Sequence, residues 1–123
     1  MEKVRAIIIN PNDRTISEQL IEPSLKEFYR IIGCETIEAN YSGNILANTG
    51  HFLYIDEEGS FKKDKKYFHI LGAHSPLTGI AVLLKYNEEG EEIDCTISVE
   101  TLSPFVKFYT EQEVNFIYNI PNN

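Results

Sequence analysis

Apolar runs separated by polar turns recur along the chain and predict a domain built mainly of β-strands. The β-branched run Val4–Asn10 is followed by the breaker Pro11-Asn12-Asp13 and then by Thr15–Ile21, in which apolar and polar residues alternate imperfectly. Proline lacks the amide donor that a strand uses, and Asn and Asp favour turns. We therefore expect Val4–Asn10 and Thr15–Ile21 to pair as a hairpin.

The middle of the chain is organised around Phe52–Gly59 (FLYIDEEG), an apolar run that stops abruptly at three acids and a glycine. The pattern predicts strands at Thr36–Tyr41 and His51–Asp56. We expect a turn at Glu57-Glu58-Gly59, with Gly59 at a positive φ. Phe61–Lys66 is typical of a basic, solvated link. Tyr67–Leu71 fits either a strand or a helical turn.

One helix is predicted from Ser24 to Gly33. Its apolar residues recur at three- and four-residue spacing and form one stripe: Leu25, Phe28, Tyr29 and Ile32. Ser24 and Glu27 have the spacing of a capping box, and Gly33 suits a left-handed stop. A helix of about ten residues is marginal alone, so we expect Leu25, Phe28 and Ile32 to pack on a sheet.

Two more strands are predicted between residues 79 and 99. Gly79–Tyr86 (GIAVLLKY) is the most apolar run and is typical of a central strand. In Glu92–Val99 (EIDCTISV) apolar residues alternate with polar ones, which favours a half-buried antiparallel strand with the odd-numbered positions inward.

The tail leaves two alternatives open. Phe105–Tyr109 and Val114–Tyr118 could form a hairpin around residues 110–113. Alternatively, Thr110 and Glu113 form a capping box and Val114–Tyr118 is helical. The alternation of apolar residues over Val114–Tyr118 favours the strand. We expect the chain to fray from Ile120 onward.

Together these elements predict an α+β fold, a mostly antiparallel sheet packed by one helix at about residues 24–33, in a single domain spanning 1–123. With 123 residues, of which 42% are hydrophobic and 11% aromatic, the chain has enough apolar material for one core. The charged fraction of 24% is near the usual quarter, which argues against intrinsic disorder.

Charge and cysteine content narrow the class of protein further. A net charge of −8 repels nucleic acid and anionic membrane surfaces. Cys34 and Cys95 lack the spacing of a disulfide framework or a metal site. No stretch approaches a membrane span of about 18 apolar residues, and the first apolar run is too short for a signal peptide. We therefore expect a cytoplasmic protein that binds neither membrane nor nucleic acid directly.

The sequence predicts no catalytic residues, no metal site and no cofactor. His69 and His74 do not share a helical face and would point to opposite faces of a strand. Ser75 lies outside any G-x-S-x-G pattern, and the loop from Gly72 to Gly79 has no nucleotide-binding motif. Ligand- or partner-binding residues are expected instead near the acids and in this loop: Tyr54, Asp56, Glu57, His69, His74, Ser75 and Thr78.

Four motifs resemble a known family. They are AIIINPNDRTISE (6–18), IIGCETIEA (31–39), LYIDEEG (53–59) and PLTGIAVLL (76–84), followed by the turn NEEGEE. In order and spacing they are similar to the DUF3846 family, small domains of unknown function in bacteria, phages and mobile elements, over most of residues 4–99. The resemblance implies an accessory protein of a phage or mobile element, cytoplasmic in its host, and transfers no catalytic residue.

The leading functional hypothesis is a non-enzymatic binding module. It would bind a host protein, including a defence component, or a small polar ligand, through an acidic and tyrosine-bearing face. The tyrosines considered for this face are Tyr41, Tyr54, Tyr67, Tyr86, Tyr109 and Tyr118.

Two alternatives from other classes remain. One is a small enzyme with a pocket made by His69, His74 and the acids near Asp56. The other is an acidic nucleic-acid mimic, with a stripe formed by residues 56–58, 88–92 and Glu100.

Overall fold

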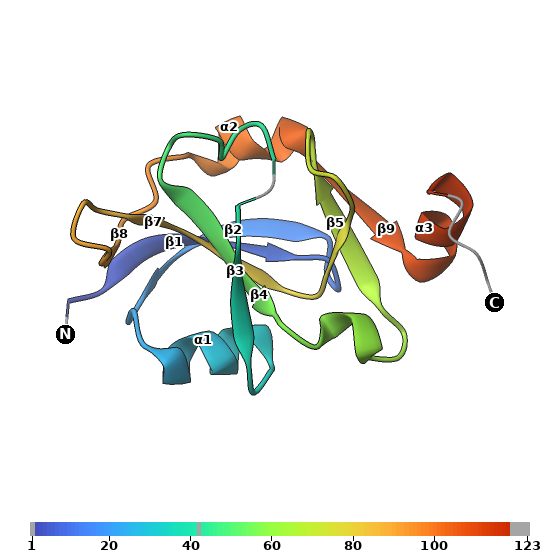
Figure 1. Cartoon of the computed structure of the whole chain (residues 1–123), viewed down its shortest axis with the longest axis horizontal. Coiled ribbons are helices and arrows are strands. Elements are labelled where there is room, and N and C mark those ends of the chain that lie inside the picture. The colour runs from blue at the N-terminus through green and yellow to red at the C-terminus, as the bar shows by residue number, and fades with distance from the viewer. Residues whose placement is uncertain (1, 42, 119–123) are drawn as a thin grey trace.

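The computed structural model describes residues 2–41 and 43–118, and within them the strands form two antiparallel sheets (Figure 1). The larger has the strand order β2-β1-β7-β4-β3, with β8 also paired to β7. Its strands are β1 (Val4–Asn10), β2 (Thr15–Ile21), β3 (Ile37–Asn40), β4 (His51–Asp56), β7 (Ala81–Tyr86) and β8 (Glu92–Ile93). The smaller sheet has the order β6-β5-β9 and comprises β5 (Lys66–Ile70), β6 (Leu77–Thr78) and β9 (Val106–Thr110).

Helical segments complete the fold and confirm the predicted α+β class. The α-helices are α1 (Leu25–Ile32), α2 (Val99–Leu102) and α3 (Glu111–Ile117), and the 3-10 turns are η1 (Gly59–Phe61) and η2 (Ser103–Phe105). The opening hairpin is confirmed, because β1 and β2 pair along their whole predicted lengths, from Val4 opposite Ile21 to Asn10 opposite Thr15. The predicted central strand is also confirmed, since β7 lies between β1 and β4.

The large sheet separates two apolar clusters, because successive side chains of a strand point to opposite faces. Figure 1 shows α1 on one side of the sheet and α2 on the other. On the α1 side, Phe28 and Ile32 pack with Phe52 and Val82. On the other side, residues of the large sheet pack with residues of the small sheet and α2, including Leu53, Leu83, Phe68, Ile70 and Leu102. The two sheets therefore share the apolar cluster on the side of α2.

Helix α1 begins and ends as predicted, but two details differ. Ser24 accepts a hydrogen bond from the Glu27 amide at 3.3 Å, and Gly33 adopts a left-handed φ of 77°. The Glu27 carboxylate, however, pairs with Arg30, while the Ser24 amide donates to the Glu22 carbonyl, so the capping box is only half formed. Leu25 is 59% exposed, so its predicted packing on the sheet is wrong.

The predicted strand at Glu92–Val99 is wrong beyond Ile93, where β8 ends. The backbone of the following residues is bonded to groups other than a neighbouring strand. The Cys95 amide donates to the Arg5 carbonyl at 2.8 Å, and the Thr96 amide donates to the His51 imidazole at 3.0 Å. The apolar alternation nevertheless holds, since Cys95 is buried and Thr96 is exposed.

In the tail, the favoured strand at Val114–Tyr118 is wrong and the helical alternative is correct. Thr110 and Glu113 form a complete capping box, with the Thr110 amide donating to Glu113 Oε1 at 2.9 Å and the Glu113 amide donating to Thr110 Oγ1 at 3.1 Å. These local bonds start α3, which buries Val114. Strand β9 pairs with β5, so Tyr67–Leu71 is resolved as a strand rather than a helical turn. The fraying expected from Ile120 lies outside the described residues.

Candidate functional site

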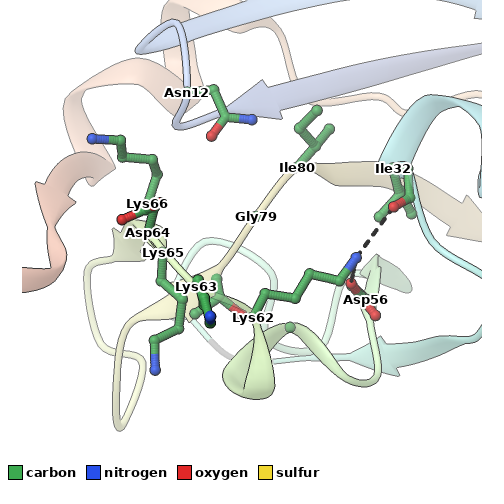
Figure 2. A pocket seen from close by; sticks show the side chains of 13 residues that line it. Asn12, Ile32, Asp56, Lys62, Lys63, Asp64, Lys65, Lys66, Gly79 and Ile80 are labelled. Atoms are coloured by element: carbon green, nitrogen blue, oxygen red, sulfur yellow. Dashed lines mark hydrogen bonds and ion pairs between the residues drawn. The ribbon is translucent and has the colours of Figure 1, made fainter.

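The lysine-rich segment after η1 forms one wall of a hollow of about 220 Å³ (Figure 2). The other walls come from the C-terminal end of α1, the end of β4, the β1–β2 turn and the junction of β6 with β7. We call this hollow the lysine pocket, after its lining residues Lys62, Lys63, Lys65 and Lys66. Asp56 and Thr78, two of the predicted binding residues, also line it.

Asp56 is held by an ion pair at the edge of the pocket. Its Oδ2 lies 2.7 Å from Lys62 Nζ, and its Oδ1 accepts a hydrogen bond from the Glu58 amide at 2.9 Å. Lys62 also donates to the carbonyl of Gly33, at the end of α1, at 3.3 Å. The hydrogen bond that Lys62 donates to the Asp56 carboxylate raises the pKa of Lys62. The negative charge of the buried Asp56 carboxylate is thus neutralised by Lys62, as Figure 2 shows.

Lys62 stands between the lysine pocket and a second hollow of about 570 Å³, which shares Gly33, Asp56 and Lys62 with it. Cys34 lines this second hollow. Burial, followed by the nearby charge of Asp56, raises the pKa of the Cys34 thiol. A thiol that stays protonated at neutral pH is a weak nucleophile, so Cys34 lacks the electrostatic surroundings of a catalytic cysteine.

The remaining lysines of the pocket differ in their partners. Lys65 donates to the Ser60 carbonyl at 3.1 Å and lies 3.6 Å from Glu111. The ammonium groups of Lys63 and Lys66 have no hydrogen bond or ion pair within residues 2–41 and 43–118. Figure 2 shows the ammonium group of Lys66 turned away from Asp56. With four lysines against Asp56 and Asp64, the lining of this pocket has an excess of basic side chains, although the chain has a net charge of −8.

Gly59 positions Thr78 in the pocket wall by close approach rather than by an unusual backbone angle. The predicted positive φ at Gly59 is wrong, because the φ angle of Gly59 is not positive and the residue begins η1 instead. A Cβ at this position would lie far inside van der Waals contact with Thr78 Oγ1. Only glycine therefore allows η1 to pack this closely on β6.

Tyr54, another predicted binding residue, is committed to the fold. Its ring lies 4.7 Å from that of Phe28 and 4.8 Å from that of Phe52, centroid to centroid. Its hydroxyl lies 3.0 Å from the Tyr86 hydroxyl and donates to Glu92 at 2.8 Å. Burial and these hydrogen bonds raise the pKa of Tyr54. Its polar atom is therefore already satisfied within the chain.

The other predicted residues are dispersed. Glu57 is exposed just after β4, and His74 and Ser75 are exposed in the loop between β5 and β6. His69 Nε2 lies 2.9 Å from the Ala73 carbonyl, which can only accept, so this nitrogen carries the proton. His69 lines a different hollow from Asp56. The enzyme hypothesis requires these two side chains to converge, and the fold separates them.

Metal-binding geometry is also missing from the part of the chain that the structure describes. No group of three or more His, Cys, Asp or Glu residues there is placed to hold a metal ion. Among the same residues, no helix is long and apolar enough to cross a membrane.

Sequence reasoning missed the lysines as site residues because it interpreted Phe61–Lys66 as a solvated link. A signal was present, since residues 62–66 read KKDKK in a chain with 11 basic and 19 acidic residues. What could not be inferred was the hollow beside them, which depends on α1 and the β6–β7 junction coming together.

Comparisons of the chain with known protein families, with curated proteins and with solved structures found no match. The resemblance to the DUF3846 family therefore stays a prediction.

Proposed function

We propose that this protein is a non-enzymatic binding module whose lysine pocket takes a small anionic ligand. The observation that supports it is that Lys63 and Lys66, whose ammonium groups have no partner among the described residues, line a hollow of about 220 Å³ in an otherwise acidic chain. Unpaired cations that line a concave surface attract anions, and charge-assisted hydrogen bonds are stronger than neutral ones.

Neutral donors support the same class of ligand. Thr78 lines the pocket with a hydroxyl, and Asn12 lines it with a side-chain amide from the β1–β2 turn. Ile32 and Ile80 add apolar surface. A few convergent polar groups on a partly apolar lining are typical of small-molecule sites. Phosphate- or carboxylate-bearing compounds fit this lining best.

The biological setting belongs to the same proposal and is supported only by the sequence resemblance. In this setting the module is an accessory protein of a phage or mobile element and acts in the cytoplasm of a bacterial host. A counter-defence role would then consist of capturing an anionic host compound rather than a nucleic acid. The nucleic-acid mimic is less favoured, because Asp56 of its acidic stripe is neutralised by Lys62.

The test is an isothermal titration calorimetry experiment in which inorganic pyrophosphate is added to the whole chain. The double variant Lys63→Gln/Lys66→Gln should weaken binding about tenfold or more for each lost contact, because a hydrogen bond to a charged group contributes about 1.5–3 kcal/mol.

The matched control is Lys3→Gln/Lys26→Gln, which removes the same charge outside the pocket and should change affinity little. Equal weakening by both double variants would reduce the effect to general electrostatics and contradict the site. Absence of binding at millimolar pyrophosphate would contradict the proposal that the pocket binds an anion. If pyrophosphate binds, native mass spectrometry of protein purified from host lysate would identify the physiological compound.

A further inference from the structure

The outer face of the small sheet carries a set of aromatic side chains with no role in the core. In the β5–β9 pairing, Tyr67 lies opposite Tyr109 and His69 lies opposite Lys107. The neighbouring residues Phe68, Ile70 and Val106 face the core. Because side chains alternate along a strand, His69, Lys107 and Tyr109 point to the opposite face, away from the core.

This outer face is hollowed beside the end of α3. A hollow of about 460 Å³ lies there, and we call it the aromatic groove. Its lining residues are His69, Leu71, Pro104, Phe105, Lys107, Tyr109 and Tyr118. The rings of Tyr109 and Tyr118 stand nearly perpendicular, at 85° and 6.4 Å between centroids, and those of His69 and Tyr118 are 5.9 Å apart. Two perpendicular ring walls can hold a third aromatic ring by stacking on one and edge contact with the other.

Lys107 and the two tyrosines supply hydrogen-bond donors to the aromatic groove. Lys107 is exposed and has no ion pair within the described part of the chain, and no described residue that lines the groove carries a carboxylate. The hydroxyl groups of Tyr109 and Tyr118 have no hydrogen-bond partner among the described residues. Burial, and then the neighbouring Tyr109, raise the pKa of Tyr118, so its phenol remains a protonated donor at neutral pH.

We propose that the aromatic groove is a second binding site, specific for a small planar aromatic anion such as an aryl carboxylate or sulfonate. The aromatic walls select a flat ring, while Lys107 and the phenols select a negative charge on it. The hollow lies on β5, β9 and η2 and shares no lining residue with the lysine pocket. The proposal is therefore independent of the proposed function.

The experiment is a two-dimensional NMR titration of the whole chain with naphthalene-2-sulfonate, repeated with the neutral naphthalene-2-methanol. Saturable shifts should appear at His69, Tyr109 and Tyr118, and the sulfonate should bind about tenfold or more tightly than the alcohol. The substitution Lys107→Met should remove most of that preference while leaving binding of the alcohol unchanged. The substitution Tyr109→Leu should weaken both probes.

Controls separate this result from misfolding and from the lysine pocket. Lys26→Met and Tyr41→Leu make the same chemical changes at exposed positions outside the groove and should bind both probes normally. Lys63→Gln/Lys66→Gln should also bind both probes normally. Shifts centred on the lysine pocket, or no saturable binding at millimolar probe, would overturn the proposal. Equal affinity for sulfonate and alcohol would overturn the anion specificity and indicate an uncharged apolar occupant, such as a partner's side chain.

Discussion

Acidification should destabilise this protein through one buried histidine, His51, at the start of β4. Its Nε2 accepts the Thr96 amide at 3.0 Å, and a backbone amide can only donate, so the ring proton resides on Nδ1. Nδ1 lies 2.9 Å from Thr49 Oγ1, which in turn donates to the Leu46 carbonyl at 2.7 Å. Both nitrogens of the neutral imidazole are therefore hydrogen-bonded. The bond to Thr96 connects the irregular segment after β8 to β4 of the large sheet.

The magnitude follows from the pKa of this imidazole. Burial, with a smaller contribution from the charge of Lys85 on β7, lowers the pKa of His51 from 6.5 to about 4. In the unfolded chain His51 takes up a proton near pH 6.5, whereas the folded chain resists it until about pH 4. The unfolded state thus binds more protons across this window, and the free energy of unfolding falls as the pH drops through it. A tenfold difference in proton affinity corresponds to about 1.4 kcal/mol, so the loss approaches about 3 kcal/mol and levels off below the lower pKa.

The assay is urea unfolding followed by circular dichroism at several pH values through this window. The variant His51→Gln keeps an acceptor near the Thr96 amide but cannot titrate, so its stability should depend less on pH by about 3 kcal/mol. His74→Gln removes an exposed histidine and should follow the wild-type profile. If wild type and His51→Gln lose the same stability on acidification, the lowered pKa and the reasoning from it are wrong. An NMR titration of the His51 ring would give its pKa directly.

Two further substitutions test contacts described above. Gly59→Ala should destabilise the fold by about 1–3 kcal/mol in thermal unfolding, because its methyl group would overlap Thr78 Oγ1. In the Thr78→Ala background the cost should shrink, whereas an undiminished cost would refute this explanation. Tyr54→Phe should cost about 1–2 kcal/mol in urea unfolding, because the Tyr86 hydroxyl and the Glu92 carboxylate lose their shared partner. The control is Tyr29→Phe, because the Tyr29 hydroxyl has no hydrogen bond within the described residues, and it should change stability little. Equal destabilisation by Tyr54→Phe and Tyr29→Phe would argue against the Tyr54 network.

The sequence by itself determined the elements whose signals are local. The proline-broken hairpin and the ends of α1 were predicted to the residue, because proline, Ser24 and Gly33 act on their own backbone and immediate neighbours. The apolar run of β7 predicted a central strand because only a strand covered on both faces tolerates such a sequence.

The pattern of apolar and polar residues did not decide two segments near the C-terminus. Val114–Tyr118 alternates like a strand, yet the two bonds of the Thr110–Glu113 capping box make it helical. Residues 94–98 alternate correctly but form no ladder, because Arg5 and His51, distant in sequence, bond their backbone.

The candidate site depended most on contacts between distant segments. The residues KKDKK are visible in the sequence, but the hollow beside them exists only because α1, η1 and the β6–β7 junction meet there. The aromatic groove likewise requires β5 to pair with β9, about 40 residues further along the chain. Sequence patterns report the burial preference of each segment, whereas a binding site depends on which segments meet, and that is decided by packing of the whole chain.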